Sequence, residues 1–109
     1  KKSGFKLNLK NVTKVYNKGS VIESSLIGWL LSGYQKYGED LKSISGKVSH
    51  SGEGLWTVEA AKRLKVPVPI IEGALKYRVQ SDKKPRYTGQ VVSALRNQFG
   101  GHEVMKHKT

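Results

Sequence analysis

An arginine and a histidine lie close together near the C-terminal end of the sequence, with two glycines between them. The stretch reads Ala94-Leu95-Arg96-Asn97-Gln98-Phe99-Gly100-Gly101-His102. A guanidinium group offers a planar fork of donors that matches a phosphate or a carboxylate, and an imidazole adds a donor whose charge changes near neutral pH. Residues of these two types at this spacing indicate the binding of an anion.

The two glycines decide whether both side chains can reach the same ligand. In an uninterrupted helix His102 would lie about 240° round the axis from Arg96, on a different face. Glycine readily adopts the left-handed conformation that closes a helix, and a pair of glycines makes continuation unfavourable. The sequence therefore predicts that a helix ends at Gly100 and that the chain folds back, so that Arg96 and His102 converge on one anion. The alternative is a capped helix with a surface arginine and a solvated histidine.

The same string resembles the C-terminal signature of the 6-phosphogluconate dehydrogenases, especially the shorter bacterial form, in which Leu-Arg-Asn-Gln-Phe-Gly-Gly-His occurs. The resemblance spans roughly residues 15–104, and its motifs follow one another in the family's order. The other stretches that carry it are Gly19-Ser20-Val21-Ile22, Ser51-Gly52-Glu53-Gly54-Leu55-Trp56-Thr57, and Val66-Pro67-Val68-Pro69 followed by Ala-Leu-x-x-Arg.

The resemblance implies an activity, a ligand and an assembly. The activity is NAD(P)-dependent oxidation of 6-phosphogluconate, followed by loss of carbon dioxide to give ribulose 5-phosphate. In the family, the equivalents of Arg96 and His102 belong to a tail that holds the substrate's phosphate end in the neighbouring subunit's active site, which implies a homodimer. Thr57 matches a threonine near the bound substrate, and Arg78 matches an arginine that is either a substrate ligand or a structural one. The implied location is the cytoplasm.

The sequence departs from the family at several positions. Asn17, Lys18 and Glu23 stand where the family usually carries arginines, and Leu55 stands where a basic residue is common. An apolar side chain cannot pair with phosphate, so the contact at Leu55 is lost or made elsewhere. Thr57, taken alone, is better explained as a helix N-cap than as a substrate ligand.

Composition sets wide limits. The chain has 109 residues, no cysteine, and 20 Lys and Arg against 8 Asp and Glu, which gives a formal net charge of +12. Such a charge attracts polyanions, including nucleic acid, anionic membranes and phosphorylated metabolites. No apolar run approaches the roughly 20 residues needed to cross a bilayer, and no signal peptide is evident. The absence of cysteine excludes disulfides and permits a reducing compartment.

Two alternative functions follow from these features. The first is a small basic helical nucleic-acid-binding domain, favoured by the charge and by lysines that could form one stripe along a helix, although a solvated face is the better explanation of the stripe. The second is the C-terminal domain of a related β-hydroxyacid dehydrogenase that binds a carboxylate. The stripe consists of Lys2, Lys6, Lys10, Lys14 and Lys18.

Several kinds of chemistry are missing from the sequence. It contains no G-x-G-x-x-G motif and no βαβ pattern, so NAD or NADP would be bound by a domain outside this chain, and the chain by itself is predicted to bind no cofactor and to be inactive. It begins without methionine, as expected of a C-terminal piece of a longer dehydrogenase. No catalytic residue can be assigned. The histidines, His50, His102 and His107, make no credible metal site without cysteines and with few carboxylates.

The elements that position the candidate residues are all helical. We expect one all-α domain over residues 1–109 with five or six helices, at about 8–17, 21–36, 58–65, 69–80 and from 88 to the double glycine, with a short helical turn at 39–44. A capping box formed by Ser20 and Glu23 would begin the second helix. Trp56 should lie in the core, as should a stripe on the fourth helix formed by Ile70, Ile71, Ala74 and Tyr77. The tail beyond His102 should be loose.

Overall fold

The structure, a computed structural model, describes residues 4–106 and has five α-helices there. Their bounds are α1 (Leu9–Asn17), α2 (Ser25–Tyr37), α3 (Glu53–Arg63), α4 (Pro69–Lys83) and α5 (Tyr87–Gly100). Within the described range the only extended pairing is a single antiparallel bridge between Ile44 and Lys106. The prediction of an all-α fold with five or six helices is confirmed, and the number is five.

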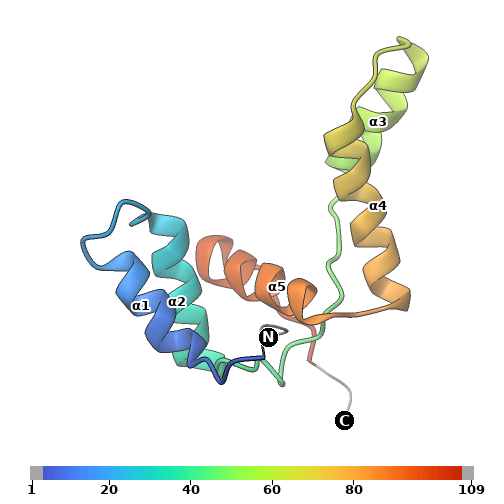
Figure 1. The fold of residues 1–109 in the computed structure, drawn as a ribbon. Helices are drawn as coiled ribbons and strands as arrows, with labels where there is room; N and C mark the ends of the chain where they lie inside the picture. Colours follow the sequence, from blue (N-terminus) through green and yellow to red (C-terminus); the bar gives the residue numbers. More distant parts are fainter. Residues whose placement is uncertain (1–3, 107–109) are drawn as a thin grey trace.

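The helices form two groups (Figure 1). α2 packs against both α1 and α5 to make what we call the helical body, whereas α3 and α4 pack against each other as a hairpin, the α3–α4 arm, which projects from the body. The radius of gyration is 16.0 Å. A compact domain of about 100 residues would have a value of about 13 Å. The chain is therefore open in shape, and much of the arm faces solvent.

The buried core is small and lies in the body. Its centre is formed by Tyr34 of α2, Ala94 of α5, and Leu41 and Ile44 of the segment that follows α2. Partly buried apolar residues surround it: Leu9, Leu30, Tyr37, Tyr87, Val91 and Val104. The segment after α2, residues 38–52, is thus an integral part of the core although it forms no helix, and the short helical turn expected at 39–44 is absent.

Two glycines allow this segment to cross the start of α5 in backbone contact. A Cβ on Gly89 would lie 1.9 Å from the carbonyl oxygen of Gly46, and a Cβ on Gly46 would lie 2.5 Å from the backbone nitrogen of Arg86. No side chain larger than hydrogen fits at either position. Gln90, one residue further along α5, donates from Nε2 to the carbonyls of Leu41 and Ile44, both at 2.9 Å. The crossing fixes the segment relative to α5.

α1 begins as predicted, and α2 does not. Asn8 caps α1 by accepting a hydrogen bond from the Asn11 amide at 3.0 Å. The predicted capping box before α2 is wrong: the cap is Ser24, whose hydroxyl accepts from the Ile27 amide at 3.2 Å. Glu23 instead accepts from the Gly19 amide at 3.1 Å and closes the turn between the two helices.

The arm differs more from the prediction. α3 begins five residues earlier than expected, at Glu53, because Gly52 adopts a left-handed φ of 108° and starts the helix without a side-chain cap. α4 begins at Pro69 as predicted and continues to Lys83. Trp56 is 62 % exposed and Ile70 is 84 % exposed, so neither lies in a core. The predicted buried stripe on α4 is wrong, because no other helix among the described residues buries that face: Ile71 and Ala74 are also exposed, and Tyr77 is half-buried.

The glycine crossing can be tested by stability. Gly89→Ala should lower the free energy of unfolding by about 3 kcal/mol or more, since the methyl group would overlap the Gly46 carbonyl and force the backbones apart. Gly73→Ala on α4 is the matched control, because nothing lies within 4 Å of its Cβ position. There, alanine should stabilise the protein by about 0.5–1 kcal/mol. Urea unfolding measures the change in unfolding free energy for each variant, and equal changes would show that the backbone of residue 46 does not contact Gly89.

A pair of tyrosines joins the same elements. The Tyr87 hydroxyl donates to the carbonyl of Glu39 at 2.7 Å and lies 3.0 Å from the Tyr34 hydroxyl. Burial raises the pKa of Tyr87 well above its ordinary value, and the hydrogen bond with Tyr34 and the nearby carboxylates of Glu39 and Asp40 raise it further. The folded protein therefore keeps Tyr87 protonated at a pH where the unfolded chain loses the proton.

This pKa shift predicts a dependence of stability on pH. Because the folded-state pKa of Tyr87 is raised, its contribution is fully present below the unfolded value of 10.0 and is lost as pH rises above it. Tyr87→Phe should make the decline of the unfolding free energy above about pH 10 shallower than in the unsubstituted protein. Chemical unfolding at pH 8 to 11 measures the two slopes, and parallel slopes would show that Tyr87 is not responsible.

Candidate functional site

A cavity of about 480 Å³ lies between the arm and the helical body, and three of the predicted site residues line it. Arg78 reaches it from α4, Arg96 from α5, and His102 from the segment after α5. The inner face of α4 gives it an apolar wall and the start of α3 gives it polar groups. The other lining residues are His50, Ser51, Glu53, Gly54, Ile70, Ile71, Ala74 and Leu75.

The chain folds back after α5 as the glycines predict. α5 ends at Gly100, and Gly101 closes it with a left-handed φ of 66°. His102 then lies over the end of the helix, so that a Cβ on Gly100 would be 3.0 Å from the imidazole Cδ2. Arg96 and His102 consequently line one cavity from consecutive elements, and the absence of a side chain at Gly100 leaves room for the ring.

Arg96 is held in place by the body. Its Nη1 donates to the carbonyl of Ser49 at 2.9 Å, across from α5 to the segment that precedes α3. A guanidinium has five N–H donors, so this bond orients the group and leaves further donors for a ligand. The side chain is half-buried. Arg96 is thus positioned in advance, which reduces the entropy lost when it binds an anion.

The segment carrying His102 is also fixed. The side-chain amide of Asn97 donates to the carbonyl of His102 at 2.9 Å, and its oxygen accepts from the Tyr37 hydroxyl at 2.9 Å. Further on, the carbonyl of Met105 accepts from the Ser45 amide at 2.8 Å. The expectation of a loose tail beyond His102 is therefore wrong for residues 103–106, since this segment is hydrogen-bonded to the body. His107 lies outside the described residues.

Arg78 is placed by the junction between α4 and the body. The Ser81 hydroxyl, one turn later, donates to the Arg78 carbonyl at 2.7 Å and accepts from the Val48 amide at 2.8 Å. Lys47 pairs with Asp82 at 2.9 Å on the same junction. These contacts tie the C-terminal half of α4 to the segment after α2, so Arg78 faces the cavity from a fixed helix.

One carboxylate faces the same cavity. Glu53 accepts a hydrogen bond from the Ser51 hydroxyl, and this bond, with help from the backbone and from the charge of Arg78, lowers the pKa of the carboxyl. Glu53 is therefore ionised at neutral pH. The lining has Arg78 and Arg96 against this single charge, with two histidines in addition, so the balance still favours an anion.

Thr57 lies elsewhere. It is exposed in the second turn of α3, where its hydroxyl donates to the carbonyl of Glu53 at 2.8 Å, and it is not among the residues that line the cavity. The alternative of an N-cap is wrong, because the cap is Gly52. Within one chain the structure brings together Arg78, Arg96 and His102 and leaves Thr57 apart.

Sequence reasoning did not single out the contribution of residues 49–51. The Ser49 carbonyl orients Arg96, and His50 and Ser51 line the cavity. Ser51 belongs to a stretch that carries the family resemblance, but no periodicity or motif in the sequence indicates that residues 49–51 run alongside α5. Among the described residues no group of histidines and carboxylates forms a metal site, and no described helix has the length and apolarity to span a membrane.

Comparison with known proteins decides the family. The profile described as 6-phosphogluconate dehydrogenase, C-terminal domain, matches residues 1–109. The chain belongs to this family. It is 42 % identical over 104 residues to a Bacillus subtilis protein provisionally named 6-phosphogluconate dehydrogenase YqeC, a match that covers 95 % of the chain and 35 % of that protein. It is also 34 % identical over 102 residues to the NAD(+)-dependent, decarboxylating 6-phosphogluconate dehydrogenase of Haloferax volcanii, covering 94 % of the chain and 34 % of that protein.

The chain thus spans about a third of the length of these relatives. Asn17 and Glu23, two of the residues expected to depart from the family pattern, form hydrogen bonds at the turn between α1 and α2 in this 6-phosphogluconate dehydrogenase C-terminal domain. Asn17 accepts from the Ser24 amide at 3.2 Å, and Glu23 accepts from the Gly19 amide. Leu55 is 37 % exposed on α3 and has no charge to offer an anion.

The hydrogen bonds of Asn97 can be tested. Asn97→Ala removes the bonds to His102 and Tyr37, which should lower the unfolding free energy by about 1–3 kcal/mol and release the segment after α5. The amide of Ser45, which donates to Met105, should then exchange faster with solvent. Hydrogen exchange followed by NMR measures this, with Asn11→Ala on the exposed face of α1 as the control. Unchanged exchange at Ser45 would show that Asn97 does not hold the segment.

Proposed function

We propose that this chain is the substrate-binding and dimerisation domain of an NAD(P)-dependent 6-phosphogluconate dehydrogenase, and that Arg96 and His102 bind the substrate's phosphate group. The observation that carries the proposal is the cavity where Arg78, Arg96 and His102 meet. A phosphate dianion takes bidentate hydrogen bonds from a guanidinium, and an imidazole supplies a further donor. Arg78 would be a second cationic ligand or would hold Glu53 away from the phosphate.

The position of Thr57 supports a site shared between two subunits. Thr57 lies outside the cavity that holds Arg96 and His102 in the same chain. In a homodimer where Arg96 and His102 of one protomer approach Thr57 of the other, all three residues could contact the same substrate molecule. Each active site would then require residues from both chains.

The α3–α4 arm provides a surface for such a dimer. Leu64, Val66 and Ile70 are 74 %, 52 % and 84 % exposed, and they follow one another around the turn of the hairpin. Exposed apolar residues gathered on a projecting element are typical of protein interfaces. We therefore place the dimer contact on the arm, next to Thr57.

The remaining assignments complete this proposal. NAD or NADP would be bound by a dinucleotide-binding domain elsewhere in the enzyme, because the described residues contain no βαβ unit to hold it. The 109 residues form a single helical domain that is inactive without that domain, and the enzyme works in the cytoplasm.

The family match favours this function over a nucleic-acid-binding domain or a β-hydroxyacid dehydrogenase. The lysines at positions 6, 10, 14 and 18 are exposed, which fits a solvated face and a polyanion-binding surface alike, and Lys2 lies outside the described residues.

Arg96 gives the most direct test. In the full-length enzyme that carries this domain, Arg96→Ala should raise the KM for 6-phosphogluconate about tenfold or more, because a charge-assisted hydrogen bond contributes about 1.5–3 kcal/mol. Arg63→Ala, at the exposed end of α3, removes the same charge away from the cavity and should leave KM within about twofold. An unchanged KM for Arg96→Ala would remove this residue from the site. Competition by a non-phosphorylated hydroxy acid would indicate a carboxylate site instead.

A complementation experiment tests whether the site is shared. Arg96→Ala and Thr57→Ala enzymes, each impaired alone, should regain activity when they are mixed under conditions that exchange subunits. One site of every mixed dimer would then combine an intact Thr57 with an intact Arg96, which restores about a quarter of all sites for random pairing. If both residues serve one site within a single chain, mixing restores nothing.

A further inference from the structure

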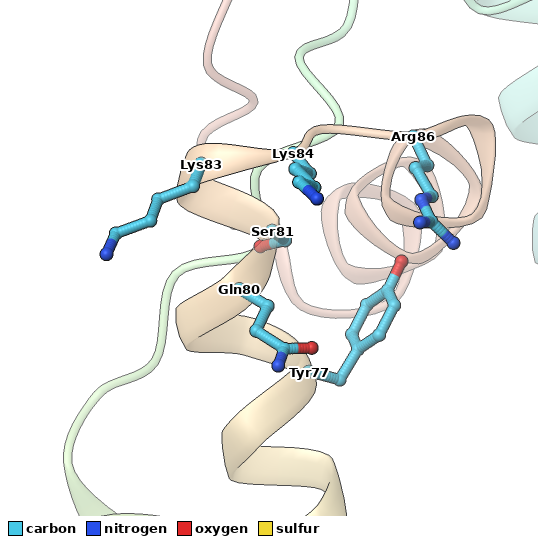
Figure 2. A pocket seen from close by; sticks show the side chains of 6 residues that line it. All are labelled: Tyr77, Gln80, Ser81, Lys83, Lys84 and Arg86. Atoms are coloured by element: carbon cyan, nitrogen blue, oxygen red, sulfur yellow. The ribbon is translucent and has the colours of Figure 1, made fainter.

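A second hollow, of about 290 Å³, lies where α4 ends and α5 begins, and cationic side chains dominate it (Figure 2). Lys84 and Arg86 extend into it, and the Tyr77 hydroxyl points toward the Arg86 guanidinium from the α4 side. Lys83 extends to the other side of the helix end. Gln80 and Ser81 complete the lining.

A proline stiffens the short connection from which these two cations extend. Arg86 has an extended conformation, with φ −134° and ψ 165°, whereas Lys84 has φ −132° and ψ 72°, outside the standard extended region, and Pro85 lies between them. Proline fixes its own φ and disfavours the helical conformation at the residue before it, which limits the freedom of the backbone between the two cations.

The segment is also anchored at both ends. The Lys84 amide donates to the Gln80 carbonyl at 3.0 Å, and the Arg86 carbonyl accepts from the Gln90 amide at 3.2 Å. The backbone of Arg86 packs directly on Gly46, where a Cβ would come within 2.5 Å of it. The two cations are thus presented from a rigid turn that is part of the core crossing.

These charges are uncompensated within the described residues. The six residues that line the hollow include Lys83, Lys84 and Arg86 and no carboxylate. The nearest acidic residue along the chain, Asp82, pairs with Lys47 on the other side of the junction. Two like charges held on one side of a rigid turn repel each other, and an anion between them removes that repulsion.

We propose that this hollow is a second anion site, separate from the cavity at Arg96, which binds a small ligand bearing a phosphate dianion through Lys84, Arg86 and the Tyr77 hydroxyl. Arg86 supplies a planar fork, Lys84 a compact charge and Tyr77 a neutral donor, a set that suits tetrahedral phosphate oxygens. The volume leaves space beside the phosphate for an organic group against the Tyr77 ring. The inference does not depend on the function proposed above.

Inorganic phosphate is the probe, titrated into the isotope-labelled 109-residue chain at constant ionic strength and followed by the backbone amides in NMR spectra. Saturable shifts are expected at residues 80, 84 and 86. Lys84→Gln with Arg86→Gln should weaken binding measured at these amides about tenfold or more, since two charge-assisted contacts are lost. Tyr77→Phe should weaken it by a smaller factor, about two- to tenfold.

The matched control removes the same charges elsewhere. Arg63→Gln with Lys65→Gln takes away one arginine and one lysine two positions apart on the arm, and should change phosphate affinity at residues 80–86 less than twofold. Equal weakening by the two double variants would show that only the overall charge of the chain attracts phosphate, and the proposal would be wrong. Absence of saturable shifts at residues 80–86 would also overturn it. Shifts at Ser49 and His102 report the other cavity, so the two proposals fail separately.

Discussion

The contact between Gly46 and Gly89 is the constraint on which the arrangement depends. It lets the segment after α2 pass directly over the first turn of α5, where the side chain of Gln90 then holds that segment at two carbonyls. The same segment continues to Ser49, whose carbonyl orients Arg96, and to Ser51 at the cavity. The position of Arg96 therefore depends on the crossing, because the backbone between Gly46 and Ser49 connects the two.

Local signals in the sequence predicted the parts that depend on local chemistry. α1 begins at Leu9, within one residue of the predicted start, Pro69 begins α4, and the double glycine ends α5 and returns the chain to bring His102 toward Arg96. The start of α2 was mispredicted because two serines compete for the role of cap. Ser24 is the cap, whereas the Ser20 hydroxyl donates to the Tyr16 carbonyl and Glu23 accepts from the Gly19 amide, and the sequence pattern cannot show that choice.

Local sequence patterns could not predict the features that depend on contacts between residues far apart in the sequence. Trp56 and Ile70 are large apolar residues of the kind found in cores, yet they lie exposed on the projecting arm, where no other described helix buries them. The cavity is formed by α4, α5 and residues 50–54, whose proximity arises from the glycine crossing and from the Val48–Ser81 hydrogen bond. Arg78 was assigned from family resemblance, and the cavity that it lines together with Arg96 became visible only in three dimensions.

The cavity at Arg96 lies on the seam between two groups of helices that otherwise touch little. Its walls belong to the arm on one side and to the body on the other, and the direct ties between them are concentrated at residues 47, 48, 81 and 82. A ligand bound there would contact both groups of helices and would limit their motion relative to each other. Binding of the ligand would therefore restrict the motion of α3 and α4 without changing where either helix begins or ends, and any surface that contacts the arm would meet a more rigid partner.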